Sequence, residues 1–251
     1  MRKLRTMIFL AMLSLCSLNI FAEDSSIAIQ NAASENRHLF IFFYKDQNEK
    51  TLRLQNIFDQ AIQKMGEQVN SIKVKANDPS EKSLIERFNL KRSPMPFVVV
   101  LAPNGAITGG FPSFTEEQLM DSISSPGAAS CLKALQDRKL VLLCLQNNRT
   151  ANNEAALKGV NEFKADPRFA NATEIIMIDP SNTKEHKFLN QLALDTHSSQ
   201  AITVLISPPA EVIGTYQGPT TKAQLASDLQ KATSGCCGPG GCCPGGKCGT
   251  R

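Results

Sequence analysis

Residues 88–100 read FNLKRSPMPFVVV, and this stretch decides how the first half of the chain is interpreted. Phe88 ends a short helical pattern, and the basic and polar residues that follow it are typical of a turn. The apolar run Phe97–Leu101 is rich in valine, which favours a strand. The stretch therefore predicts a helix end, a basic turn, and a strand that begins directly after Pro96.

Helical and strand patterns alternate on both sides of this stretch. The run from Leu39 to Tyr44 is unbroken and apolar, which indicates a strand buried on both faces. Asp78 followed by Pro79 is a helix-start pattern. The other expected elements are a helix at 26–37, an amphipathic helix at 54–65, a strand at 69–74, a turn at 103–105, a short strand at 106–108 and a helix opened by the capping pattern of residues 115–118. Together they give a helix followed by the order β-α-β-α-β-β-α.

Much of this pattern occurs a second time. Asp78-Pro79-Ser80 recurs as Asp179-Pro180-Ser181, 101 residues later. The segment Pro96–Pro103 is matched by Ala201–Pro208 at an offset of 105 residues. The apolar run at 139–145 corresponds in the same way to the first strand of the first unit. A nearly constant offset indicates a duplicated unit.

The order of elements, with parallel early strands and a final hairpin, resembles the thioredoxin superfamily. Residues 88–100 resemble the family's helix end, basic turn, cis-proline and third central strand, so the resemblance implies that Pro96 is the structural cis-proline. The implied fold class is α/β, with two tandem thioredoxin-like domains, each a central mixed sheet flanked by helices. The expected parts are a signal peptide at 1–22, thioredoxin-like domain 1 at 23–124, a linker at 125–128, a degenerate thioredoxin-like domain 2 at 129–232 and a disordered Cys/Gly-rich tail at 233–251.

The dithiol of the family is missing from both units. In thioredoxins a CxxC motif follows the first central strand and opens the next helix, where the helix N-terminus favours a thiolate. The corresponding positions are Gln47 and Lys50 in the first unit, and Asn148 and Ala151 in the second. The family's buried acid falls at Ile41 and Leu142, and Ala201 stands where the second unit would have its cis-proline. We expect no dithiol exchange at these places and no catalytic residue there; the resemblance implies a binding or scaffold module instead of an enzyme.

The N-terminus reads as a secretory signal. It has a basic start, an apolar stretch from Met7 to Leu18, and Ala22 before the expected cleavage point. We therefore expect an exported protein, periplasmic or secreted, that leaves the membrane after cleavage. The alternative is a lipoprotein signal that uses Cys16, but Leu15 before it is larger than such signals prefer.

Charge and aromatic content argue against nucleic acid as a partner. The chain has a formal net charge of +4, and three of the positive charges, Arg2, Lys3 and Arg5, belong to the expected signal, which leaves about +1. Trp is absent and Tyr occurs twice, so an aromatic stacking surface is not expected. We expect another exported protein as the partner, and neither nucleic acid nor membrane.

Two cysteines and three histidines lie within the two units. Cys144 falls in an expected buried strand and Cys131 in the helix before it, so the two could form a disulfide or serve as two structural thiols. Neither lies at a helix N-terminus. His38, His186 and His197 have no metal-ligand spacing, and we interpret each as an isolated surface histidine.

The C-terminal tail holds five of the eight cysteines within the last sixteen residues. Its glycines and prolines leave no apolar side chain to form a core. The candidate metal ligands are Cys236, Cys237, Cys242, Cys243 and Cys248. Three or four thiolates without histidine favour soft metals, such as Cu(I), Zn(II), or toxic Hg(II) and Cd(II).

Three hypotheses follow for the function. The first is an exported, redox-inactive binding protein whose tail binds a thiophilic metal ion. The second is a thiol–disulfide oxidoreductase that uses the tail cysteines. The third is a protein-interaction scaffold with a disulfide-bonded tail.

Overall fold

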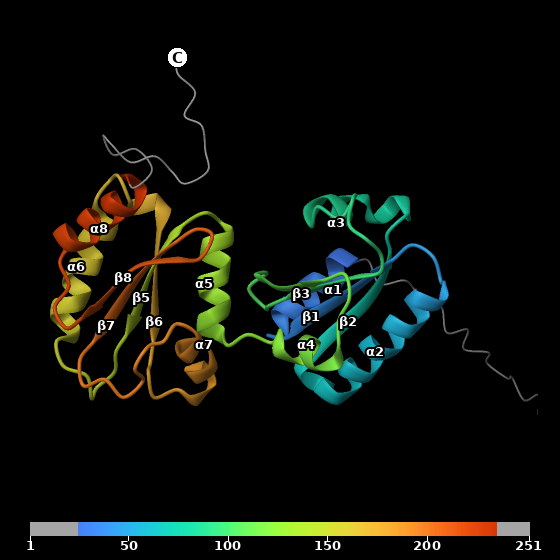
Figure 1. Cartoon of the computed structure of the whole chain (residues 1–251), viewed down its shortest axis with the longest axis horizontal. Coiled ribbons are helices and arrows are strands. Elements are labelled where there is room, and N and C mark those ends of the chain that lie inside the picture. Colours follow the sequence, from blue (N-terminus) through green and yellow to red (C-terminus); the bar gives the residue numbers. More distant parts are fainter. Residues whose placement is uncertain (1–24, 235–251) are drawn as a thin grey trace, which may run out of the picture.

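The computed structural model describes residues 25–234 of the 251-residue chain. This part contains two four-stranded sheets, each flanked by helices (Figure 1). The strand orders are β2-β1-β3-β4 and β6-β5-β7-β8. The expected signal peptide and cysteine tail lie outside the described residues, apart from the first two residues of the expected tail segment, which end a helix.

The first sheet and its helices come from the first half of the chain. Their bounds are α1 (Ser25–Ser34), β1 (His38–Tyr44), α2 (Glu49–Met65), η1 (Gly66–Gln68), β2 (Val69–Lys75), η2 (Pro79–Glu81), α3 (Lys82–Arg87), β3 (Phe97–Leu101), β4 (Ile107–Phe111) and α4 (Glu116–Asp121). Strand β1 pairs in parallel with β2 and antiparallel with β3, and β3 pairs antiparallel with β4. This is the predicted order, with parallel early strands and a final hairpin.

The second sheet repeats these pairings with its own strands. The bounds are α5 (Pro126–Gln136), β5 (Leu140–Leu145), α6 (Asn153–Ala165), η3 (Ala170–Ala172), β6 (Thr173–Ile178), η4 (Thr183–Glu185), α7 (His186–Gln191), β7 (Ile202–Ser207), β8 (Glu211–Gln217) and α8 (Lys222–Ser234). Strand β5 is parallel to β6 and antiparallel to β7, which pairs antiparallel with β8. Both hairpins shift register at corresponding places, Val100/Leu101 and Leu205/Ile206.

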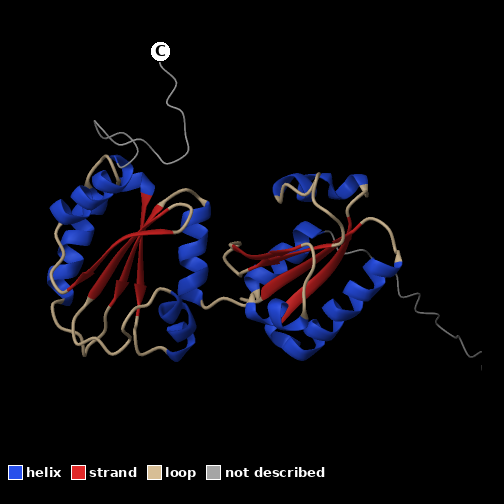
Figure 2. Ribbon diagram, viewed as in Figure 1, coloured by secondary structure: helices blue, strands red, loops and turns tan. Residues whose placement is uncertain are grey.

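Helices cover both faces of each sheet, as Figure 2 shows. In the first sheet, α2 and α4 pack on one face through residues such as Phe58 and Leu119, and α1 and α3 pack on the other. In the second sheet, α6 and α8 cover one face, and α5 and α7 cover the face turned toward the first domain. The central strands β1 and β5 are buried on both faces, which explains their unbroken apolar sequences.

Side-chain caps set the starts of several helices, of which the sequence predicted those at Asp78 and Thr115. The helix predicted at 54–65 begins earlier, at Glu49. The side chain of Asn48 accepts a hydrogen bond from the backbone N–H of Thr51 and caps α2. Thr115 and Gln118 form a reciprocal capping box at the start of α4. Asp78 accepts from the N–H of Ser80, but it opens the short 3₁₀ helix η2, and α3 follows it.

The connection between the domains lies three residues earlier in the chain than the expected linker. Helix α5 begins at Pro126 and has Ser125 as its N-cap, so residues 126–128 of the expected linker belong to the first turn of a helix. Proline fits the first turn because its missing N–H would have no intrahelical partner there. Residues 122–125 alone join α4 to α5 (Figure 1).

Helix α5 also packs against the edge strand β4 of the first domain. The side-chain amide of Gln136 donates to the carbonyl oxygen of Ile107 at 2.7 Å and accepts from its N–H at 2.9 Å. Ala102, Ala106 and Ala129 form a small buried cluster beside this contact. Gln136 thus supplies β4 with the pair of hydrogen bonds that another strand would supply. Among residues 25–234, no helix is long and apolar enough to cross a membrane.

Candidate functional site

In the first domain, the family's dithiol position lies between β1 and α2. Gln47 directly precedes the cap residue Asn48, and Lys50 is the second residue of α2; both are exposed. The peptide bond between Met95 and Pro96 is cis, in agreement with the resemblance. The two positions to which the sequence resemblance assigns the family's sulfur atoms thus hold an amide and an amine at the exposed start of α2.

In the second domain, backbone hydrogen bonds join the corresponding loop to the loop before β7. The N–H of Ala151 donates to the carbonyl of Ser199 at 2.8 Å, and the N–H of Ala201 donates to the carbonyl of Ala151 at 2.9 Å. The side-chain amide of Asn152 donates to that of Gln200 beside them. A proline at position 201 would have no N–H to give. The loss of the cis-proline thus permits the loop before α6 to bond directly to the loop before β7.

Asn147 orders the rest of this loop. Its backbone N–H donates to the Thr150 hydroxyl at 2.9 Å, and its side-chain oxygen accepts from the N–H of Arg149 at 2.9 Å. Its side-chain nitrogen donates to Asp179 at 2.8 Å. Hydrogen bonds from Asn147 and Ser181 lower the pKa of the Asp179 carboxyl, because they stabilise its charged form.

A cavity of about 340 Å³ lies against this loop. Its lining is polar and consists of Asn147, Arg149, Thr150, Pro180, Ser181, His186, Thr196, His197 and Ser198. Hydroxyl, imidazole and guanidinium groups can bind polar or anionic groups, but no residue of this lining is a cysteine. This end of the second domain therefore carries a polar cavity whose lining contains no thiol.

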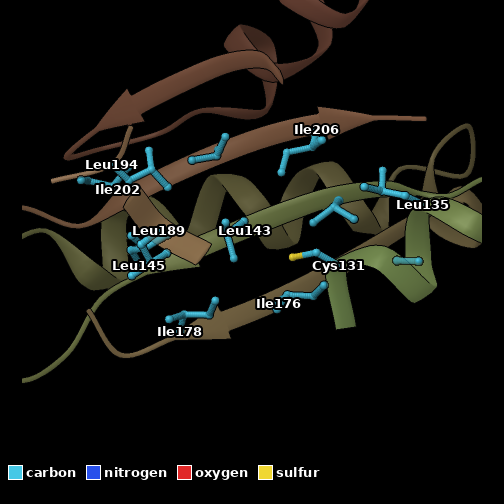
Figure 3. Packing of buried hydrophobic residues seen from close by; sticks show 13 residues of the cluster. Cys131, Leu135, Leu143, Leu145, Ile176, Ile178, Leu189, Leu194, Ile202 and Ile206 are labelled. Carbon is cyan, nitrogen blue, oxygen red and sulfur yellow. The ribbon is translucent and has the colours of Figure 1, made fainter. Parts of the chain in front are cut away.

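The two cysteines of the described residues are free and buried. Cys131 on α5 packs with Leu143 and Ile176 on one face of the sheet, where Figure 3 shows its sulfur among apolar side chains. Cys144 on β5 packs with Phe163 in the cluster on the opposite face. The disulfide that the sequence left open is therefore not formed, because the sheet separates the two side chains.

Burial also makes both thiols unreactive. It raises the pKa of Cys131 to about 12, with a further contribution from the charge of Glu185. It raises the pKa of Cys144 to about 12 as well, although a hydrogen bond with Thr203 opposes the shift. A thiol must lose its proton to act as a nucleophile or metal ligand. Both side chains therefore serve the core, as the alternative interpretation of structural thiols predicts.

The histidines are isolated, but one of them is not on the surface. His197 is exposed and His186 is half-buried, with its Nε2 3.2 Å from the carbonyl of Pro180. His38 is only 8% exposed, which corrects the expectation of a surface histidine. It begins β1 and contacts Ser124 of the interdomain connection. Its burial therefore depends on a residue distant in the sequence, which no local sequence pattern indicates.

No metal site occurs in the described part of the chain: residues 25–234 contain no group of three or more His, Cys, Asp or Glu side chains that could hold an ion. The five candidate ligands Cys236, Cys237, Cys242, Cys243 and Cys248 lie outside the described residues. Glu185, which sequence reasoning did not select, is 3% exposed and binds the start of α5. Its position follows from the packing of η4 on α5, and no sequence motif marks it.

The chain is similar to solved structures over about the length of one domain. No protein-family model matches the chain, and no curated protein matches it. Among solved structures, the germline-specific thioredoxin Deadhead from Drosophila melanogaster is 20% identical, with a TM-score of 0.30 over 36% of this chain and 81% of that one. Mitochondrial thioredoxin 3 from Saccharomyces cerevisiae is 18% identical, with a TM-score of 0.32 over 39% of this chain and 87% of that one.

Thioredoxin O1 from Arabidopsis thaliana is 14% identical, with a TM-score of 0.32 over 40% of this chain and 87% of that one. Each of these matches covers most of a thioredoxin and less than half of this chain. The strand order of both sheets, their parallel and antiparallel pairings and the cis bond before Pro96 give this chain two tandem thioredoxin-like domains.

Proposed function

We propose that the protein is an exported, redox-inactive thioredoxin-like binding protein whose C-terminal cysteines bind a thiophilic metal ion. The observation that carries the proposal is the distribution of thiols. Both domains lack cysteine at the family's dithiol positions, and their two thiols, Cys131 and Cys144, are buried with a raised pKa. The remaining thiols after the expected signal are the five of the tail.

The composition of the tail supports a soft metal as the ligand. Cys236 and Cys237 form one adjacent pair, Cys242 and Cys243 form another, and Cys248 follows. Three or four thiolates suit Cu(I) or Zn(II), and the intervening glycines allow the backbone to turn around an ion. The two domains would then present the tail to a partner, for which we propose another exported protein.

Metal analysis of two chains tests the proposal. The first is the full chain, and the second carries serine in place of all five tail cysteines. Both are purified under reducing conditions, loaded separately with Zn(II) and Cu(I), and desalted. We expect the full chain to retain about one ion, as four-coordinate thiolate sites do, and the serine variant to retain almost none. Equal retention by both chains would contradict the proposal.

The same cysteines also support a second function, that of a thiol–disulfide oxidoreductase. Adjacent thiols can exchange disulfides, which would make the tail a mobile redox group in place of the missing CxxC. An insulin-reduction assay on the two chains separates the functions. Activity in the full chain that is lost in the serine variant would favour the oxidoreductase, whereas stoichiometric metal without such activity favours the binding protein.

A further inference from the structure

Two adjacent residues of the interdomain connection are held by opposite domains. Ser124 is held by the first domain: its backbone N–H donates to Nε2 of His38 at 3.2 Å, and its hydroxyl lies 3.1 Å from the same nitrogen. Ser125 is held by the second domain: its hydroxyl donates to Glu185 at 2.5 Å. Glu185 also accepts from the N–H of Gly127 at 2.9 Å and so fixes the start of α5.

The bond to Ser124 requires a neutral imidazole. A ring nitrogen can accept a hydrogen bond only when it carries no proton, so the proton of neutral His38 resides on Nδ1. A proton that binds Nε2 turns this nitrogen into a donor that faces the N–H of Ser124. The Ser124 hydroxyl can then accept from the imidazolium, but the backbone N–H loses its partner.

Among residues 25–234, the surroundings of His38 supply no negative charge that would stabilise an imidazolium. His38 lines a cavity of about 770 Å³ between the domains, and Lys184 is the charged residue of its lining. The neighbouring Arg37 is paired with Glu35 at 3.4 Å. Glu185 is occupied with Ser125 and Gly127. Burial lowers the pKa of His38 from its usual value of 6.5, because the cavity wall replaces water around the ring.

We infer that His38 and Ser124 form a pH-sensitive clasp that holds the connection to the first domain at neutral pH and releases it in acid. Release at Ser124 detaches the connection from the first domain, whereas Ser125 remains bonded to Glu185 at the start of the second domain. The contact of Gln136 with Ile107 and the ion pair of Asp121 with Lys187 at 2.8 Å still join the domains. The segment at Ser124 is therefore expected to become mobile reversibly in acid while the domains stay together.

The protection factor of the Ser124 amide against hydrogen exchange, measured by NMR between pH 7.5 and 5, tests the clasp. The chains compared are the wild type, His38→Gln and His197→Gln. The glutamine at 38 keeps an acceptor oxygen but does not titrate, and His197 is an exposed histidine that lines the cavity beside Asn147 and not the cavity at His38. We expect the protection factor of the Ser124 amide in the wild type and in His197→Gln to fall reversibly in acid, and that in His38→Gln to stay constant. An equal fall in His38→Gln, or no fall in the wild type, overturns the inference.

A measurement on the wild type alone covers the case in which His38→Gln does not fold. The amide proton shift of Ser124 and the imidazole shifts of His38 are followed by NMR over the same pH range. Both are expected to titrate together, with a midpoint below 6.5. A Ser124 amide shift that is independent of the His38 titration would overturn the inference.

Discussion

The two domains share a left-handed backbone conformation at the residues that follow corresponding helices. Asn36 and Arg138 follow α1 and α5 with φ values of 54° and 60°. Asn89 and Ala193 follow α3 and α7 with φ values of 54° and 53°. This left-handed conformation ends a helix, and glycine adopts it most readily. The two domains thus end corresponding helices in the same way with different residues.

Ala193 is the residue at which this conformation is least favourable, because alanine has no side-chain group to compensate for the crowding of its Cβ. We expect Ala193→Gly to raise the free energy of unfolding by about 0.5–1 kcal/mol. The matched control is Ala165→Gly at the exposed end of α6, which should lower it by a similar amount. Urea unfolding of the three chains measures both effects. Destabilisation by both substitutions would contradict the interpretation of Ala193.

At the scale of elements, α6 and α8 are joined by two close contacts. Asp166, the residue after α6, pairs with Lys222 of α8 at 2.8 Å and also with Arg168. Hydrogen bonds from Arg168 and Lys222 hold the pKa of the Asp166 carboxyl well below its usual range. The second contact is at Gly159, where an added Cβ would lie 1.9 Å from the carbonyl oxygen of Thr220. Together they hold the start of α8, and Thr220 just before it, against α6.

Gly159→Ala therefore cannot be accommodated unless the segment before α8 moves. We expect it to lower the free energy of unfolding by about 1–3 kcal/mol, as overpacking of a core contact does, although alanine is the better helix former. Thermal unfolding monitored by circular dichroism gives the comparison. The control is Asn161→Ala, an exposed position on the same helix, which should leave stability unchanged or slightly higher. A Gly159→Ala chain as stable as this control would contradict the close approach.

At the scale of the whole molecule, the junction makes the two domains different in spite of their common fold. The edge strand β4 is paired by the amide of Gln136, whose two hydrogen bonds satisfy both backbone groups of Ile107. The residue 101 positions before Gln136 is Glu35, whose side-chain carboxylate has no N–H to donate to a carbonyl. These two hydrogen bonds thus arise from the joining of the two domains. The fold of a single domain does not supply them.

We expect Gln136→Ala to expose the edge of β4 without unfolding either domain. The amide of Ile107 should then exchange about 5- to 10-fold faster, which corresponds to the loss of one hydrogen bond. Hydrogen exchange measured by NMR reports this amide directly. Gln60→Ala, at an exposed position on α2, is the control and should leave the rate unchanged. Wild-type protection of Ile107 in the Gln136→Ala chain would show that other contacts cover this edge.

The sequence by itself determined the elements and the missing thiols. Apolar periodicity, the capping pattern at Thr115 and the buried character of β1 depend on residues that are neighbours along the chain, so they can be read without a structure. The absence of cysteine at Gln47 and Lys50 is a property of the sequence alone. Pro96 marked the start of β3 for the same reason.

Only the tertiary structure decided the features that depend on distant residues. It placed Cys131 and Cys144 on opposite faces of one sheet, buried His38 against Ser124, and used Glu185 to hold the start of α5. Each of these features depends on residues from different elements, and its geometry follows from how helices pack on sheets. Local patterns carry no signal for such pairs, because the side chains that meet are set by packing and not by spacing along the chain.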